Sequence, residues 1–123
     1  MKRHPALTHL SQEHHHALAL CARILRAPSQ NHADDIEHLR PDLLHHFEAE
    51  ETMFAPFWPK LPDTAWQARF EADHAALRAM LAAPQYDDEQ WNTLFAQTLR
   101  DHARFEERIL FEKITEYCLS ENG

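Results

Sequence analysis

The chain has 123 residues, of which 44% are hydrophobic and only one is glycine. Its formal net charge is −8, which argues against a nucleic-acid partner, because such partners require a basic surface. No apolar run approaches the ~20 residues of a membrane span. We therefore expect a single domain over residues 1–123 that binds neither nucleic acid nor membrane. No signal-peptide core follows the basic N-terminus, so the cytoplasm is the expected location.

A chain with almost no glycine is poorly suited to the many tight turns of a sheet protein, so we predict an all-α fold. Apolar residues at helical spacing predict four helices, over about 6–26, 33–55, 64–83 and 88–119. Pro41 should kink the second helix or split off a short first piece. The segment 56–62 is predicted to have no helix of its own. Caps are expected at Asp63 or Thr64 and at Asp87 or Asp88. The short connections favour an antiparallel, up-down-up-down four-helix bundle.

Histidine is the outlier in composition, with 11 residues. Two of them open the same pattern, His46-Phe-Glu-Ala-Glu50 on the second helix and His102-Ala-Arg-Phe-Glu106 on the fourth. A spacing of i, i+4 places both side chains on one helix face. Both pairs continue an apolar stripe, in the series Leu39, Leu43, His46, Glu50, Phe54 and Phe95, Leu99, His102, Glu106, Ile109. Buried polar groups are costly without partners, and imidazole with carboxylate suits iron, manganese or zinc.

The other two helices each offer a histidine at a similar depth. His74 lies between Phe70 and Leu77, and His14 follows Leu10 on the first helix. His15 is an alternative to His14, because a small rotation of the helix exchanges them. At ~1.5 Å per residue the four histidines can share one layer. Four imidazoles and two carboxylates are more than one ion uses, so the layer predicts two ions bridged by the carboxylates.

Two further predictions concern residues near this layer and far from it. Glu51 and Glu107 are expected at the surface, or hydrogen-bonded to a ligand histidine. Cys21 and Cys118 lie on opposite sides of the layer, roughly 34 Å apart on helices of ~1.5 Å rise per residue. That distance is far beyond disulfide reach, so both thiols are expected to be free.

Four stretches resemble the hemerythrin-like (HHE cation-binding) domain family, and together they span nearly the whole chain. They are Leu10-Ser-Gln-Glu-His14-His15, His46-Phe-Glu-Ala-Glu50-Glu51, Glu71-Ala-Asp-His74 and His102-Ala-Arg-Phe-Glu106-Glu107. The resemblance implies a non-haem di-iron centre, oxo- or hydroxo-bridged, with Glu50 and Glu106 bridging and His14, His46, His74 and His102 as terminal ligands. It implies binding or sensing of O2, nitric oxide or peroxide, or iron handling, in a binding protein rather than a dedicated enzyme.

The chain departs from this family at one position. Oxygen-carrying hemerythrins have a second histidine one turn after the one on the third helix, and here that residue is Arg78. The departure puts simple oxygen carriage in doubt. One ion then has an open or water-filled position, or takes a histidine from elsewhere, for which the candidates are His9, His15, His16 and His45.

Two other classes of function stay open. A ferritin-like carboxylate oxidase uses Glu-x-x-His pairs on two helices, and the chain contains Glu13-x-x-His16 and Glu71-x-x-His74. The other alternative is a helical interaction domain that is metal-free or stabilised by zinc.

Overall fold

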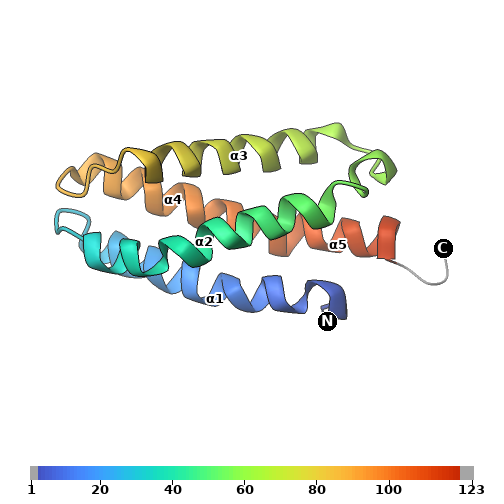
Figure 1. The fold of residues 1–123 in the computed structure, drawn as a ribbon, viewed down its shortest axis with the longest axis horizontal. Coiled ribbons are helices and arrows are strands. Elements are labelled where there is room, and N and C mark those ends of the chain that lie inside the picture. Colours follow the sequence, from blue (N-terminus) through green and yellow to red (C-terminus); the bar gives the residue numbers. More distant parts are fainter. Residues whose placement is uncertain (1–2, 120–123) are drawn as a thin grey trace.

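The computed structural model describes residues 3–119, and this part of the chain contains helices and connections but no strand, as predicted. Its elements are α1 (Pro5–Arg26), α2 (Ala33–Phe54), η1 (Trp58–Lys60), α3 (Thr64–Ala82), α4 (Glu89–Phe105), η2 (Glu106–Leu110), α5 (Phe111–Ile114) and η3 (Thr115–Leu119). The last four follow one another without a gap, so the described residues form four long helical rods that lie side by side (Figure 1). None of these helices is both long and apolar enough to cross a lipid bilayer.

Polar side chains begin the long helices close to the predicted positions. Asp63 accepts a hydrogen bond from the backbone N–H of Ala65 at 2.9 Å, and Asp88 accepts one from Gln90 at 2.8 Å. Each carboxylate satisfies a backbone donor that has no partner within its helix. The caps of α3 and α4 are therefore Asp63 and Asp88, one from each predicted pair.

One end of the bundle is held together by a buried amide. The connections after α1 and after α3 both lie at this end (Figure 1). The Nδ2 of Asn92 donates to the carbonyl oxygens of Pro28, Gln30 and Tyr86 at 2.9, 3.1 and 3.0 Å. Asn92 is fully buried, so one side chain on α4 ties both connections to the bundle.

One local prediction about the helices is wrong, and one of the two outcomes expected at Pro41 is excluded. The segment 56–62 does contain a helical turn, the short 3₁₀ helix η1. Pro41 does not split α2, which is continuous from Ala33 to Phe54. Removing one backbone donor thus leaves the remaining helical hydrogen bonds of α2 sufficient to keep it in one piece.

The predicted apolar stripe of the fourth rod fails beyond Glu106. Ile109 is 41% exposed, whereas Leu110 is fully buried. The cause is η2, a π-helical turn from Glu106 to Leu110, because such a turn contains an extra residue and shifts the following side chains around the axis. Leu94, nearer the start of the rod, is also exposed, at 57%.

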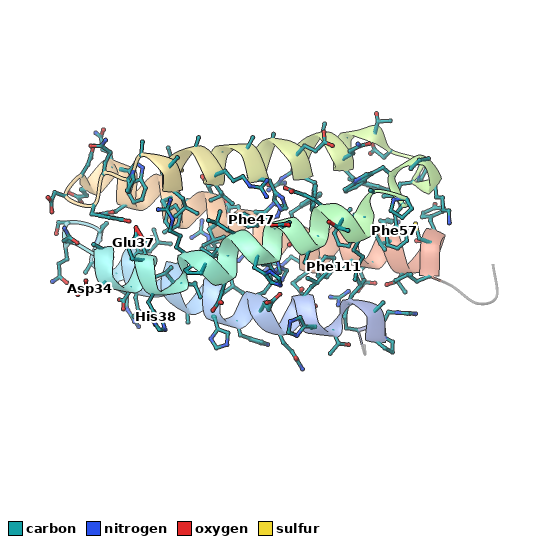
Figure 2. The ribbon with its side chains drawn as sticks, viewed as in Figure 1. Asp34, Glu37, His38, Phe47, Phe57 and Phe111 are labelled. Atoms are coloured by element: carbon teal, nitrogen blue, oxygen red, sulfur yellow. The ribbon has the colours of Figure 1, made fainter. Side chains whose placement is uncertain are left out.

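Buried apolar residues form two clusters, one toward each end of the bundle. The first cluster contains Ala17, Leu20, Cys21, Ile24, Ile36, Leu43, Phe47, Leu77, Leu81, Phe95, Ala96 and Leu99. The second contains Leu7, Leu10, Phe54, Leu61, Phe70, Phe105, Leu110, Phe111 and Ile114. Figure 2 shows Phe47 and Phe111 between the helices, while Asp34 and His38 lie on the outer side of α2.

The two cysteines are free, as predicted. Cys21 belongs to the first cluster, and Cys118 packs against the second. Between these clusters, every long rod contributes one or two buried polar residues.

Candidate metal centre

Six buried histidines and glutamates from all four rods meet between the apolar clusters. Their exposed fractions are 5% for His14, 5% for His46, 0% for Glu50, 2% for His74, 2% for His102 and 0% for Glu106. The residue next to His14, His15, is exposed. The rotation of α1 therefore points His14 rather than His15 into the layer.

The two glutamates lie between the imidazoles. Glu106 has one oxygen 2.8 Å from Nε2 of His14 and the other 3.3 Å from Nε2 of His102. Glu50 has one oxygen 3.1 Å from Nε2 of His46 and the other 3.2 Å from Nε2 of His74. Each carboxylate thus touches an imidazole with each of its two oxygens.

This arrangement contains two groups that could each hold a metal ion. One consists of His14, His46, Glu50 and Glu106, and the other of Glu50, His74, His102 and Glu106. Within each group, one ligand atom per residue lies within 4.8 Å of all the others. The groups share both glutamates, so two ions held there would be neighbours.

Buried atoms without hydrogen-bond partners fit a cation at this place. They include Nε2 of His46, His74 and His102, both carboxylate oxygens of Glu50 and one of Glu106. These atoms lie about 3 Å from one another in the histidine–glutamate contacts described above, but most of those contacts do not have the geometry of a hydrogen bond. An unpaired buried polar atom costs about 1–3 kcal/mol. Cations held in the two groups would satisfy these atoms together, and the nitrogen and oxygen donors suit iron, manganese or zinc.

The opposite nitrogen of every imidazole is bonded to a carboxylate further out. The Nδ1 atoms of His14, His46 and His74 lie 2.8 Å from Glu107, Glu13 and Glu51, and that of His102 lies 2.9 Å from Asp73. A carboxylate at Nδ1 accepts a hydrogen bond from the N–H there, so that in the neutral imidazole the lone pair is on Nε2. All four Nε2 atoms are then available to an ion in the centre.

Burial and neighbouring charges give the two central glutamates opposite properties. Burial raises the pKa of Glu50 well above its usual range, and the charge of Glu106 adds to this effect. Burial also opposes ionisation of Glu106, but His102, His14 and His46 hold the pKa of this carboxyl well below its usual range. Without a cation the pair therefore resists carrying two negative charges, because neighbouring carboxylates repel each other.

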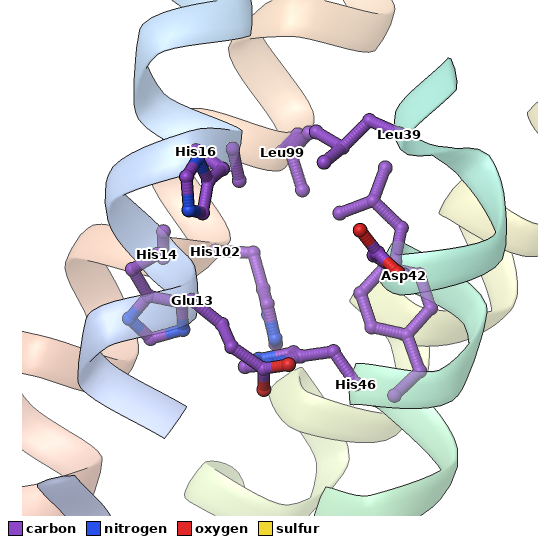
Figure 3. Close-up of a pocket in the computed structure, with 12 residues that line it drawn as sticks. Glu13, His14, His16, Leu39, Asp42, His46, Leu99 and His102 are labelled. Carbon is purple, nitrogen blue, oxygen red and sulfur yellow. The ribbon is translucent and has the colours of Figure 1, made fainter. Parts of the chain in front are cut away.

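A small pocket borders the centre on the side of α1 and α2. It has a volume of about 60 Å³, and Figure 3 shows it among His14, His46, His102 and Leu99. Its remaining walls come from Glu13, His16, Ala17, Leu39, Asp42, Leu43, Phe47 and Ala103. The space is mostly apolar and accommodates only a few atoms beyond the side chains.

On the side of α3, aromatic rings cover the centre. The ring centroids of Phe47 and Phe70 lie 4.5 and 4.1 Å from that of His74. Phe47 and Phe70 therefore pack against the ring of His74, which also lines a second pocket of about 540 Å³.

Arg78 does not take the role of the histidine that it replaces. Its guanidinium forms two hydrogen bonds with Glu51, one of them of 2.9 Å. The four histidines considered as substitutes, His9, His15, His16 and His45, are all exposed. The structure brings none of them into the layer, so each group has two imidazoles.

The ferritin-like ligand pattern is not assembled either. His16 and Glu71 are exposed, and Glu13 bonds to Nδ1 of His46 rather than facing the centre. The residues that would carry this alternative therefore do not meet.

Sequence reasoning missed Glu13 and Asp73 as partners of the buried imidazoles. A signal was present, since each directly precedes an inward histidine, His14 or His74. Together with the two His-x-x-x-Glu-Glu stretches, these Glu-His and Asp-His pairs form a repeat that was only half recognised.

Comparison with known proteins bears on the same residues. The family model described as "Hemerythrin HHE cation binding domain" matches residues 6–114, which include all six residues of the centre. No curated protein and no solved structure gives a significant match.

Proposed function

This chain belongs to the hemerythrin HHE cation-binding domain family, and on that premise we propose that it holds two iron ions and binds a small ligand beside them. The observation that carries the proposal is the pair of four-residue groups sharing Glu50 and Glu106. Shared carboxylates favour two adjacent ions over the single closed site typical of structural zinc. The proposal includes one domain with antiparallel, up-down-up-down rods, which is consistent with the adjacent connections at one end of the bundle.

In this proposal the ligands divide evenly between the ions. His14 and His46 would hold one ion, His74 and His102 would hold the other, and Glu50 and Glu106 would be shared between them. An iron pair, when bound, supplies the electrons for reversible binding or reduction of O2, nitric oxide or peroxide. The residues of the chain hold the ions, exclude bulk water and leave space for a ligand.

The pocket beside His14 and His46 supports a ligand of very few atoms. Its volume of about 60 Å³ and its apolar walls suit a diatomic molecule or peroxide better than an organic substrate. With two imidazoles per ion and Arg78 turned to Glu51, both ions have fewer protein ligands than an octahedral ion uses. We therefore propose ligand sensing, scavenging or iron handling ahead of dedicated enzymatic turnover.

The test is iron loading without oxygen, followed by measurement of metal content and of the optical spectrum on exposure to air. We expect two irons per chain. The His46→Ala variant should lose most of this metal, because it removes an inward ligand, whereas the neighbouring His45→Ala should retain it, since His45 is exposed. One ion per chain, uptake of zinc alone, or equal metal in both variants would contradict the proposal.

A further inference from the structure

Four outer carboxylates connect the rods in a closed ring around the centre. Glu13 of α1 bonds to His46 of α2, and Glu51 of α2 bonds to His74 of α3. Asp73 of α3 bonds to His102 of α4, and Glu107 of η2 returns to His14 of α1. Every rod thus supports an imidazole of the next rod.

The ring follows from a repeat in the sequence. Glu13 and Asp73 directly precede the inward histidines of α1 and α3, while Glu51 and Glu107 directly follow the inward glutamates of the other two rods. Neighbouring residues on a helix point about 100° apart. One side chain of each pair therefore reaches the centre while the other reaches the imidazole of an adjacent helix.

We propose, building on the metal site above, that Glu13, Glu51, Asp73 and Glu107 are positioning residues that hold the four imidazoles and bias an iron pair toward its oxidised state. A carboxylate at Nδ1 fixes the orientation of the ring and makes Nε2 a stronger donor. Its negative charge also stabilises the more highly charged oxidised ions, since charge and hydrogen bonding around a centre set its reduction potential. Such a bias favours transfer of electrons out of the centre over reversible release of a ligand.

The four carboxylates differ in how far their charge is compensated. Arg78 forms two hydrogen bonds with Glu51, Arg3 lies 3.2 Å from Glu107, and Arg69 lies 3.4 Å from Asp73.

Glu13, by contrast, has His9 at 3.5 Å as its outer partner among the described residues. Glu13 also lines the pocket beside His46. Its charge is thus the least neutralised of the ring, and its removal should change the potential most.

The experiment compares amide variants that keep the shape of the side chain but remove its charge. Glu13→Gln and Asp73→Asn should weaken Zn²⁺ binding about 10- to 100-fold and raise the reduction potential of the iron-loaded protein. Glu71→Gln is the matched control, because Glu71 is an exposed carboxylate on α3 that bonds to Gln67 rather than to an imidazole. It should change neither quantity.

A second pair of variants should shift the reduction potential in opposite directions. Glu51→Gln should raise the potential, whereas Arg78→Gln should lower it, because it leaves the charge of Glu51 uncompensated. A purely structural role of this ion pair predicts no such reversal. Arg78→Gln also leaves all four ring carboxylates in place, so it remains measurable if an amide variant folds poorly.

The outcomes separate this inference from the proposed function. A wild-type chain that takes up no iron pair overturns the proposed function and this inference with it. A wild-type chain with two irons, together with ring variants that match Glu71→Gln in potential, overturns the inference alone. Shifts of the same sign in Glu51→Gln and Arg78→Gln overturn it as well.

Discussion

His14 and His102 are protonated at neutral pH in the metal-free protein. Burial opposes their charge, but hydrogen bonds to Glu106 and Glu107 raise the pKa of His14 to about 9. Burial likewise opposes the charge of His102, yet Glu106 and Asp73 raise its pKa to about 9. His74 behaves oppositely, since burial and the nearby His102 lower its pKa to about 4. Two imidazoles must therefore release protons before they can act as ligands.

These shifts predict that the metal-free protein loses stability as the pH rises above neutrality. The pKa values of His14 and His102 are raised from 6.5 to about 9 on folding. Their contribution is therefore complete below pH 6.5 and is lost as the pH approaches 9. The raised pKa of Glu50 acts in the same direction, and His74, with its pKa of about 4, stays neutral throughout this range.

Thermal unfolding with a chelator present should thus give a lower Tm at about pH 8.5 than at about pH 6.5. The metal-loaded protein should lack this decline, because its ligand histidines are already neutral. A Tm that rises over this interval in the chelated protein would contradict the assignment.

At the level of residues, the sequence predicted five of the inward six, left His14 and His15 as alternatives, and missed Glu13 and Asp73 as outer partners. Those five inward side chains continue apolar stripes at helical period, whereas the choice of His14 depends on the rotation of α1. Glu13 and Asp73 lie outside these stripes, and their role depends on how closely the neighbouring helix approaches. The spacing of apolar residues along one helix does not specify how closely its neighbour approaches.

Pro41 is a destabilising residue in the interior of α2. It has no N–H to donate within the helix, and its side chain is exposed. An interior proline costs a helix about 3 kcal/mol relative to alanine.

Pro41→Ala is accordingly expected to stabilise the protein by about 1–3 kcal/mol, since α2 has already adapted to the proline. Urea unfolding measures this change, and the metal content per chain should equal that of the wild type. A loss of metal in a stabilised variant would instead mean that Pro41 sets the orientation of His46.

The π-helical turn explains why the end of the fourth rod was predicted less well than its beginning. A period of 3.6 residues continues the stripe from Glu106 to Ile109, but the buried residue is Leu110. The extra residue in η2 lets Glu106 reach the centre while Leu110 and Phe111 both enter the second cluster. Tertiary packing selects this turn, and local sequence carries little sign of it.

At the scale of the whole molecule, the polar layer lies between two apolar clusters of comparable character. The clusters supply burial at both ends, and the buried amide of Asn92 closes the end that contains the connections after α1 and α3. Changes at that end should therefore affect folding without altering the ligands.

Asn92→Ala is expected to destabilise the protein by about 1–3 kcal/mol, because it removes the buried donor that binds three backbone carbonyl oxygens. Metal content should be unchanged. Asp87→Ala serves as the control, since it removes only the exposed hydrogen bond of 2.8 Å from Asn31 at the same end. Equal destabilisation by the two variants would mean that the buried amide of Asn92 does not hold this end of the bundle together.

The small size of the pocket also restricts how the centre communicates with larger molecules. A space of about 60 Å³ admits neither a flavin ring nor a thiol peptide, and the imidazoles behind it are at most 5% exposed. A redox partner of that size would therefore have to exchange electrons with the centre from outside this pocket rather than by entering it.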